Sequence, residues 1–299
     1  MARKRLTVEK ISLLLIALPG ILHFVVFKYV PLLGNVMAFQ DFNMFKGFFG
    51  SDWVGFKHFA TMFQYPEFYQ ILRNTLLLSF YSIVFGFPAP LVLALLLNEV
   101  RSMWFKRPVQ TLLYLPHFLS WIIVGGIFLN LLSATGIVNM TLASFGMNPQ
   151  QFLTEPGYFR PVLVFISIWK EVGWGTILYL AALAGVNPNL YEAARVDGAS
   201  RLRQMRHITL PSLVPTIVVL FLLRIGGVLE ANAEQVLVFI NPVNREAAEV
   251  IDTYVYRVGL LGAQFSYTTA IGIFQALVGL LLIVVLNAVS KKTTGESIY

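Results

Sequence analysis

The sequence predicts an all-α integral membrane protein with six transmembrane helices. Of its 299 residues, 57% are hydrophobic and only 12% are charged, and the mean hydropathy is +0.71. A water-soluble domain of this length does not need so apolar a composition. Inside hydrocarbon, only helices and closed barrels satisfy every backbone polar group, and the alternating strands of a barrel are absent. The spans are therefore expected to be helices.

Six apolar segments each hold the roughly 20 apolar residues that a helical span requires. They cover residues 11–38, 73–98, 110–133, 162–185, 212–229 and 268–289. The first segment follows a basic start, but no small-residue cleavage site comes after it, and its apolar run is too long for a signal peptide. We interpret it as a retained first helix.

The distribution of Lys and Arg predicts the orientation, because cytoplasmic loops collect basic residues. Thirteen of them fall in segments 1–10, 99–109, 186–211 and 290–299, and six fall on the opposite side. Both termini are therefore expected in the cytoplasm. The domain organisation follows as a cytoplasmic N-terminus at 1–10, a transmembrane domain at 11–292 and a cytoplasmic tail at 293–299.

The loops on the opposite side differ in character from the basic ones. Residues 39–72 are rich in Phe and also contain Trp53, a composition suited to a folded aromatic cap at the membrane interface. Residues 134–161 surround a short apolar run with Gly, Asn and Pro, which suggests a small re-entrant or interfacial helix. Residues 230–267 carry more acidic than basic side chains.

The cytoplasmic segment 187–211 is predicted to form two short helices. The run from Asn187 to Asn189 is a helix-start signal, with Asn189 as the expected N-cap and Glu192 completing a capping box. Gly198 is expected to end the first helix. A second helix would begin after Ser200, and the next span would begin at Pro211, where a missing N–H costs little.

The same segment resembles the EAA motif of the inner-membrane permeases of binding-protein-dependent ABC importers. The matching positions are Glu192, Ala193, Ala194, Gly198, Ile208, Leu210 and Pro211. The longer form "LYEAARVDGAS" followed by "ITLP" is similar to the maltose-type carbohydrate branch. "WKEVGWGTILYLAALAGVNPNLYEAARVDGAS" and "DTYVYRVGL" further resemble a subgroup that imports oligosaccharides, and the resemblance covers residues 11–292.

This resemblance implies the type I ABC importer permease fold in the bacterial cytoplasmic membrane. The expected partners are a second, homologous permease in a heterodimer, two cytoplasmic ATPase subunits and an extracytoplasmic solute-binding protein that delivers the sugar. ATP and Mg²⁺ would bind the ATPase subunits, and nucleic acid is not an expected partner. The resemblance assigns the coupling to the ATPases to Glu192, Ala193, Ala194, Asp197, Gly198 and Arg201.

The chain lacks the motifs of an enzyme. It contains no GxxxxGK[ST] loop to cradle phosphates, no HExxH and no GxSxG. The four histidines, at positions 23, 58, 117 and 207, lack metal-ligand spacing, and cysteine is absent. No cofactor or metal is therefore expected in this chain, and the energy for transport must come from partner subunits.

Ionisable residues within the spans mark candidate positions on a substrate path, because charge in hydrocarbon is costly. Lys170 and Glu171 are adjacent on a helix and so point about 100° apart, which predicts that they do not simply pair with each other. Arg224 is expected near mid-membrane. Two roles are open for the basic residues. Lys170 or Arg224 would pair with Glu171 or Glu230 to hold helices together, or Lys170 and Arg224 would line a cavity and attract the carboxylates of an acidic, uronate-containing sugar.

Neighbouring polar and aromatic side chains could complete a sugar site, because sugars bind through stacking faces and hydroxyl partners. The candidates are Trp174, Tyr179, Asn232, Glu234 and Gln235. Two competing functions remain open from the sequence. One is an ABC permease for a different solute, and the other is a secondary transporter that uses Lys170, Glu171 and Arg224 as a relay.

Overall fold

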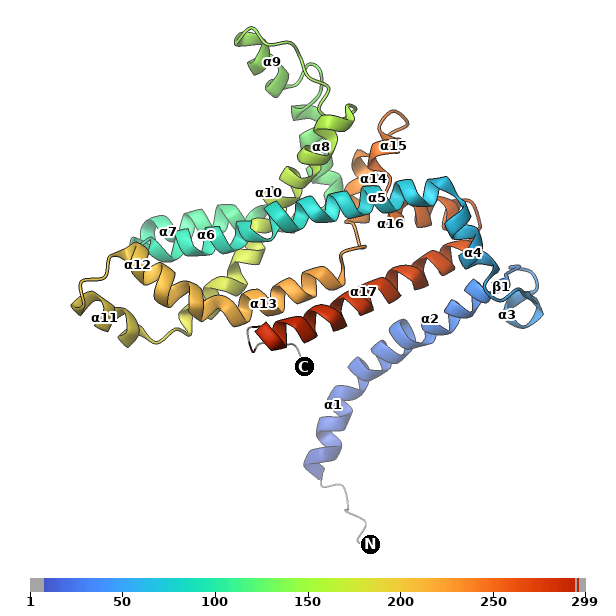
Figure 1. Cartoon of the computed structure of the whole chain (residues 1–299), viewed down its shortest axis with the longest axis horizontal. Coiled ribbons are helices and arrows are strands. Elements are labelled where there is room, and N and C mark those ends of the chain that lie inside the picture. Colours follow the sequence, from blue (N-terminus) through green and yellow to red (C-terminus); the bar gives the residue numbers. More distant parts are fainter. Residues whose placement is uncertain (1–7, 294, 296–299) are drawn as a thin grey trace. The chain divides into compact units, whose positions relative to one another are not determined.

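The computed structural model describes residues 8–293 and 295 of the chain (Figure 1). They fall into two compact units, the first made of residues up to Tyr65 with Arg257–Phe274 and the second of Pro66–Tyr256 with the residues from Gln275 onward. Arg3, Lys4 and Arg5 of the predicted N-terminus lie outside the described residues. So do residues 294 and 296–299 of the predicted tail.

The first unit combines a long apolar helix with a short β-hairpin. Its elements are α1 (Val8–Phe24), the π-helical turn η1 (Val25–Tyr29), α2 (Val30–Leu32), the 3₁₀ segment η2 (Leu33–Phe39), β1 (Gln40–Asp41), α3 (Gly47–Gly50), β2 (Asp52–Trp53) and α4 (Lys57–Gln64). The π-helical η6 (Val255–Leu261) and α17 (Phe265–Thr293) begin or end in this unit and continue into the other.

The second unit is helical throughout its described part. Its elements are α5 (Pro66–Tyr81), the π-helical turn η3 (Ser82–Gly86), α6 (Pro88–Glu99), α7 (Met103–Tyr114), the 3₁₀ turn η4 (Leu115–Phe118), α8 (Trp121–Leu131), α9 (Ile137–Ser144), α10 (Pro156–Ala184), α11 (Pro188–Val196), α12 (Arg201–Gln204), the π-helical turn η5 (Met205–Thr209), α13 (Leu210–Gly226), α14 (Ala233–Phe239), α15 (Arg245–Ala248) and α16 (Ile251–Tyr254).

Five continuous helical stretches are long and apolar enough to cross a membrane. They are Ser12–Phe39, Pro66–Glu99, Pro156–Ala184, Arg201–Gly226 and Phe265–Thr293. A sixth span exists if the bent pair Met103–Phe118 and Trp121–Leu131 counts as one. The predicted spans are therefore recovered, except that the third, over 110–133, is not one straight helix: it bends by 102° at Leu119 and Ser120.

The break in the third span has a local cause. Pro116 lies in the 3₁₀ turn η4 and cannot donate a backbone hydrogen bond there. Ser120 then takes an extended backbone conformation, and its Oγ accepts a hydrogen bond from Ile123 N at 3.3 Å, which caps the start of α8. In Figure 1, α8 accordingly turns away from the direction of α7.

The long helix α10 forms the centre of the second unit. Its Gly173 lies against the backbone of α7, so closely that a Cβ there would come within 2.0 Å of Leu113 O. Thr176 donates to Pro90 O of α6 at 3.3 Å. Two apolar clusters flank these contacts, one around Phe159 and Ile166 and the other around Tyr179. The small residues on α10 let neighbouring helices approach closely, as expected for helices in lipid.

Candidate functional site

A cavity of about 620 Å³ opens within the second unit. Its walls come from the α5–η3–α6 stretch, from α10, from α13 and from the segment around α14. Six of the side chains that the sequence indicated for a substrate path line this cavity: Glu171, Trp174, Tyr179, Arg224, Asn232 and Gln235. Residues far apart in the sequence thus meet around a space large enough for a small-molecule ligand.

Arg224 is the cation that reaches the cavity without an acidic partner. Its Nη2 donates a short hydrogen bond to Ser82 Oγ of η3. Among the described residues, no carboxylate oxygen lies within 4.0 Å of its guanidinium. The expected ion pair with Glu230 is therefore not formed, although Glu230 also lines the cavity. A guanidinium has five N–H donors, so most of those on Arg224 remain available to a bound anion.

Lys170 and Glu171 form an ion pair, and the prediction that they would not pair is wrong. Lys170 Nζ lies 3.0 Å from Glu171 Oε1. A helical wheel compares only the directions in which side chains leave the helix, whereas the four-carbon stem of lysine can carry its ammonium round to the next residue. Lys170 is only 6% exposed and does not line the cavity.

His117 contacts both members of this pair, a role that no sequence pattern indicated. His117 Nδ1 lies 2.7 Å from Glu171 Oε2, and Lys170 Nζ donates to His117 O at 2.8 Å. The ammonium also lies 5.2 Å from the centre of the Trp121 ring, which is a cation–π distance. The turn η4 and the start of α8, on either side of the break, are thereby fastened to α10.

Trp174 contacts the cluster of Lys170, Glu171 and His117 and also forms part of the cavity wall. Its indole stacks on the His117 ring, with ring centroids 4.5 Å apart and planes 2° apart. Phe118 packs edge-on against the same indole at 6.0 Å. The Trp174 side chain is 46% exposed, so part of the ring remains open to the cavity. A fixed, partly open indole is a surface on which a sugar ring can stack.

The remaining predicted residues have mainly local contacts. Asn232 caps α14, and its Oδ1 accepts from Gln235 N at 3.4 Å. Gln235 is 5% exposed, and its Nε2 donates to Leu163 O of α10 at 2.7 Å. Tyr179 is buried among apolar neighbours. Glu234 is exposed and lies outside the cavity lining.

The segment that resembles a coupling motif forms an exposed helix and a tight turn. α11 begins at Pro188, and its N-cap is Asn187, whose side chain accepts from Asn189 N at 3.0 Å. The expected cap at Asn189 is thus displaced by two residues, because Pro188 occupies the first helical position. Gly198 ends the turn with φ +72°, a left-handed conformation that glycine adopts without steric cost.

The second predicted short helix is the first part of a longer one. Ser200 makes no side-chain capping bond, and α12 continues through η5 into α13, so that one helical stretch runs from Arg201 to Gly226. Pro211 therefore lies inside this stretch and does not begin a new helix. Arg201 pairs with Glu99 at the end of α6 at 3.6 Å. This exposed pair contributes little to stability.

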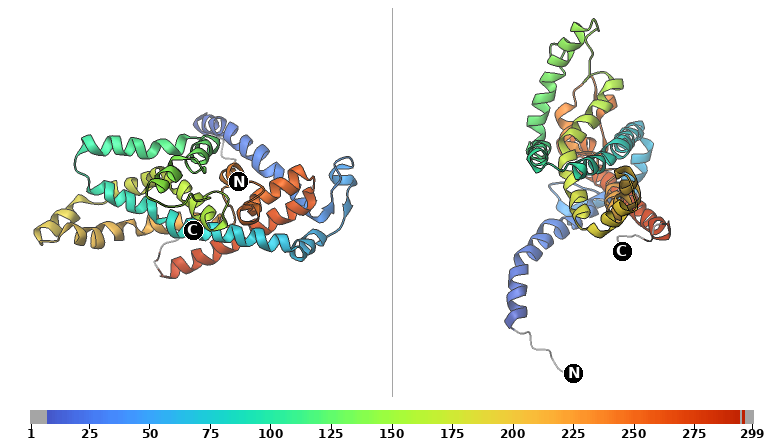
Figure 2. Two further views of the ribbon diagram at one scale, coloured as in Figure 1. Left: turned by 90° about the horizontal axis from the view of Figure 1, so that it is seen from above. Right: turned by 90° about the vertical axis from the view of Figure 1, so that its left-hand side faces the viewer.

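Residues 187–211, called the coupling segment below because they resemble that motif, present apolar side chains to their surroundings. Leu190, Val196 and Leu202 are 49%, 88% and 74% exposed, and Glu192, Ala193 and Asp197 are exposed beside them. In Figure 1 and in the left view of Figure 2, α11 and α12 lie at one end of the second unit, beside the turn from α6 to α7. Such a protruding apolar surface is typical of a protein interface.

Known proteins resemble this chain over nearly its whole length. Residues 86–295 match the family model described as binding-protein-dependent transport system inner membrane component. The polygalacturonan/rhamnogalacturonan transport system permease protein YteP of Bacillus subtilis (strain 168) is 50% identical, over 99% of this chain and 94% of that protein.

Two solved structures share the fold. One is a crystal structure of a bacterial ABC transporter involved in the import of the acidic polysaccharide alginate, with a TM-score of 0.88 and 44% identity over 96% of this chain and 97% of that chain. The other is a bacterial alginate ABC transporter in complex with an alginate pentasaccharide-bound periplasmic protein, with a TM-score of 0.89 and 43% identity over 97% of each chain.

Proposed function

The chain belongs to the family of binding-protein-dependent transport system inner membrane components, and we propose that it carries an acidic oligosaccharide through the membrane as one half of an importer. It is an integral membrane permease subunit of a sugar ABC importer. The observation that supports an acidic cargo is Arg224, a cavity-lining guanidinium with no carboxylate within 4.0 Å in the described part of the chain. The named cargoes of the relatives, polygalacturonan and alginate, are themselves acidic polysaccharides.

The assembly that this proposal requires has several further members. A second, homologous permease subunit would complete the pathway, two ATPase subunits holding ATP and Mg²⁺ would bind the coupling segment, and a solute-binding protein would deliver the sugar. The related alginate transporter was solved together with a periplasmic protein. The protein would lie in the bacterial cytoplasmic membrane with both termini and the coupling segment in the cytoplasm, an orientation supported by the excess of basic residues there.

The continuous helix from Arg201 to Gly226 suggests how ATPase movement reaches the cargo. The two arginines Arg201 and Arg224 are separated by 23 residues, or roughly 35 Å at the helical rise. Closure of the ATPase pair would displace α12, and the same helix would move the guanidinium that lines the cavity. The cavity could thus change its opening and its charge environment together, which is the requirement of alternating access.

The charge on Arg224 can be tested by transport. Arg224→Gln keeps a polar, hydrogen-bonding side chain but removes the positive charge. We expect uptake of a uronate-bearing oligosaccharide to fall about tenfold or more, because a charge-assisted hydrogen bond contributes roughly 1.5–3 kcal/mol. Uptake of a neutral oligosaccharide of the same length should change little.

Glu230→Gln provides the matched control, because it removes a charge of opposite sign from the same cavity. This variant should leave uronate uptake unchanged or increase it. An equal loss of neutral and acidic uptake in Arg224→Gln would contradict an acidic cargo while leaving the permease assignment intact. Transport driven by an ion gradient without ATP would contradict the importer itself.

A further inference from the structure

A β-hairpin in the first unit carries an apolar tip. β1 and β2 pair antiparallel, with Gln40 opposite Trp53 and Asp41 opposite Asp52. Between the strands the chain forms the short helix α3. We use the term hairpin tip for the four apolar side chains in this turn, Met44, Phe45, Phe48 and Phe49.

The tip is exposed to an unusual degree for aromatic side chains. Phe45 and Phe49 are 101% and 105% exposed, and Met44 is 69% exposed. Phe42 is partly exposed and packs against Phe48 with ring centroids 5.3 Å apart. In water the exposed side chains of the hairpin tip would carry the cost of hydrating apolar surface.

The hairpin lies next to the ends of two candidate membrane spans. The first span ends at Phe39, immediately before β1. Phe42 N donates to Ser266 Oγ at 2.9 Å, and Phe42 meets the Phe265 ring at 6.3 Å. Phe265 is the first residue of the last span. Both candidate spans thus end beside the hairpin.

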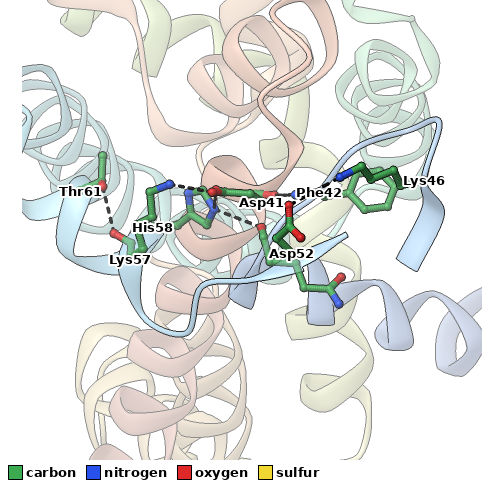
Figure 3. A network of polar contacts seen from close by, with 9 residues as sticks. Asp41, Phe42, Lys46, Asp52, Lys57, His58 and Thr61 are labelled. Carbon is green, nitrogen blue, oxygen red and sulfur yellow. Dashed lines mark hydrogen bonds and ion pairs between the residues drawn. The ribbon is translucent and has the colours of Figure 1, made fainter. Parts of the chain in front are cut away.

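The hairpin also carries charged side chains that pair with one another and with the start of α4 (Figure 3). Lys57 Nζ and His58 Nε2 lie 2.7 and 3.0 Å from the Asp41 carboxylate, and Lys46 Nζ lies 3.6 Å from Asp52. The hydrogen bond from Lys57 holds the pKa of Asp41 below its usual value. The hairpin thus combines paired charges with exposed phenylalanines, as an amphipathic element does.

We propose that the hairpin tip inserts into the lipid leaflet at which these two spans end, the outer leaflet in the orientation proposed above. Aromatic side chains are enriched at this level of a bilayer. Continuity with two candidate membrane spans favours lipid over a protein partner. The inference does not depend on the identity of the cargo.

Single cysteines can measure the depth directly, because the chain has no cysteine of its own. The variants are Phe45→Cys and Phe49→Cys. Asp52→Cys is the matched control, because Asp52 belongs to the paired charges of the same hairpin and its side chain is 81% exposed. Each is assembled into the complete importer, reconstituted in liposomes and labelled with a nitroxide. Signal from thiols of the partner subunits is subtracted by using the complex with the unsubstituted chain.

Collision with oxygen, which concentrates in lipid, is compared with collision with a water-soluble nickel chelate. At positions 45 and 49 we expect a several-fold higher ratio of oxygen to nickel collisions than at position 52. Nickel accessibility at 45 and 49 equal to that at 52 would overturn the proposal. So would protection from both reagents, or protection that arises only when the solute-binding protein is added, because these results indicate a protein interface.

Discussion

His117 connects a buried cation to the cavity wall through a chain of four side chains. Lys170 is 6% exposed, and such an ammonium is tolerated only with close partners. It has Glu171 at 3.0 Å, the His117 carbonyl at 2.8 Å and the Trp121 ring. Glu171 in turn holds the imidazole against Trp174. Orientation of the exposed indole therefore depends in part on Lys170, a charge that does not itself line the cavity.

Two substitutions of His117 should distinguish the effect of its hydrogen bond to Glu171 from the effect of its stacking on Trp174. His117→Ala removes both, whereas His117→Asn keeps an N–H that can donate to Glu171 but loses the ring beneath Trp174. A stacked pair contributes about 0.5–1.5 kcal/mol, so both variants should raise the KM for sugar uptake roughly two- to tenfold. The measurement is uptake rate against concentration of sugar-loaded binding protein, with the level of membrane protein held equal.

The two variants differ in their second readout. His117→Ala leaves Glu171 with one partner fewer. The melting temperature of the His117→Ala protein in detergent should therefore fall below that of the His117→Asn protein. An unchanged KM in both variants would show that the indole has no part in binding. A rise in KM with Ala but not with Asn would assign the effect to the Glu171 hydrogen bond alone.

Sequence reasoning indicated three of these four side chains. Charge within an apolar segment is visible in the sequence and indicated Lys170 and Glu171, and Trp174 was named as a possible sugar-stacking residue. His117 was not visible, because its partner Glu171 lies 54 residues away and no spacing rule covers a contact between separate helices. The pairing of Lys170 with Glu171 was predicted wrongly because only backbone directions were compared, without the reach of the lysine stem.

At the scale of helices, α10 and α7 approach each other closely next to the cavity-lining Trp174. Gly173 contacts the backbone of α7, where an added Cβ would come within 2.0 Å of Leu113 O. A backbone carbonyl cannot rotate aside as a side chain could. The distance between these helices therefore depends on the absence of one methyl group, and Trp174 follows directly in the chain.

Gly173→Ala should consequently destabilise the protein. The helices must separate or bend, and overpacking of this kind costs about 1–3 kcal/mol. Gly157→Ala on the same helix is the control, because nothing lies within 4 Å of a Cβ there. That control should be neutral or slightly stabilising, since alanine favours helix by up to about 1 kcal/mol. Thermal unfolding of both purified variants in one detergent provides the comparison, and equal melting temperatures would contradict the close packing.

Hydropathy predicted where the spans lie but could not predict the break in the third one. The residues around Leu119 and Ser120 are nearly as apolar as the rest of the segment. The mean hydropathy of a sliding window therefore hardly changes there. Pro116 and the serine cap were the available signals, and both are weak when taken alone. The cap at Asn187 and the continuation of α12 into α13 were missed for a similar reason, since several residues in that segment could serve as caps.

At the scale of the molecule, one helix joins the two regions for which we propose coupling and cargo binding. The coupling turn at Gly198 leads into α12, and the same helical stretch ends two residues after Arg224. The π-helical turn η5 interrupts its hydrogen-bond pattern between Met205 and Thr209. Such turns are frequent at functional positions. A rigid connection with one adjustable turn can convert a push at the ATPase into a displacement within the cavity.

Gly198 provides the sharpest test of this connection, because the chain contains a glycine of matched geometry elsewhere. Gly198 has φ +72° and Gly146 has φ +76°, and nothing lies within 4 Å of a Cβ at either position. Gly198→Asp and Gly146→Asp therefore introduce the same charge and nearly the same backbone strain, about 1–2 kcal/mol. Any difference between the two variants must come from location. We expect Gly198→Asp to abolish sugar uptake and the stimulation of ATP hydrolysis by loaded binding protein, while the subunit remains in the membrane at its normal level. Gly146→Asp should keep both activities, and coupled uptake at the normal rate in Gly198→Asp would show that the turn does not transmit the ATPase stroke.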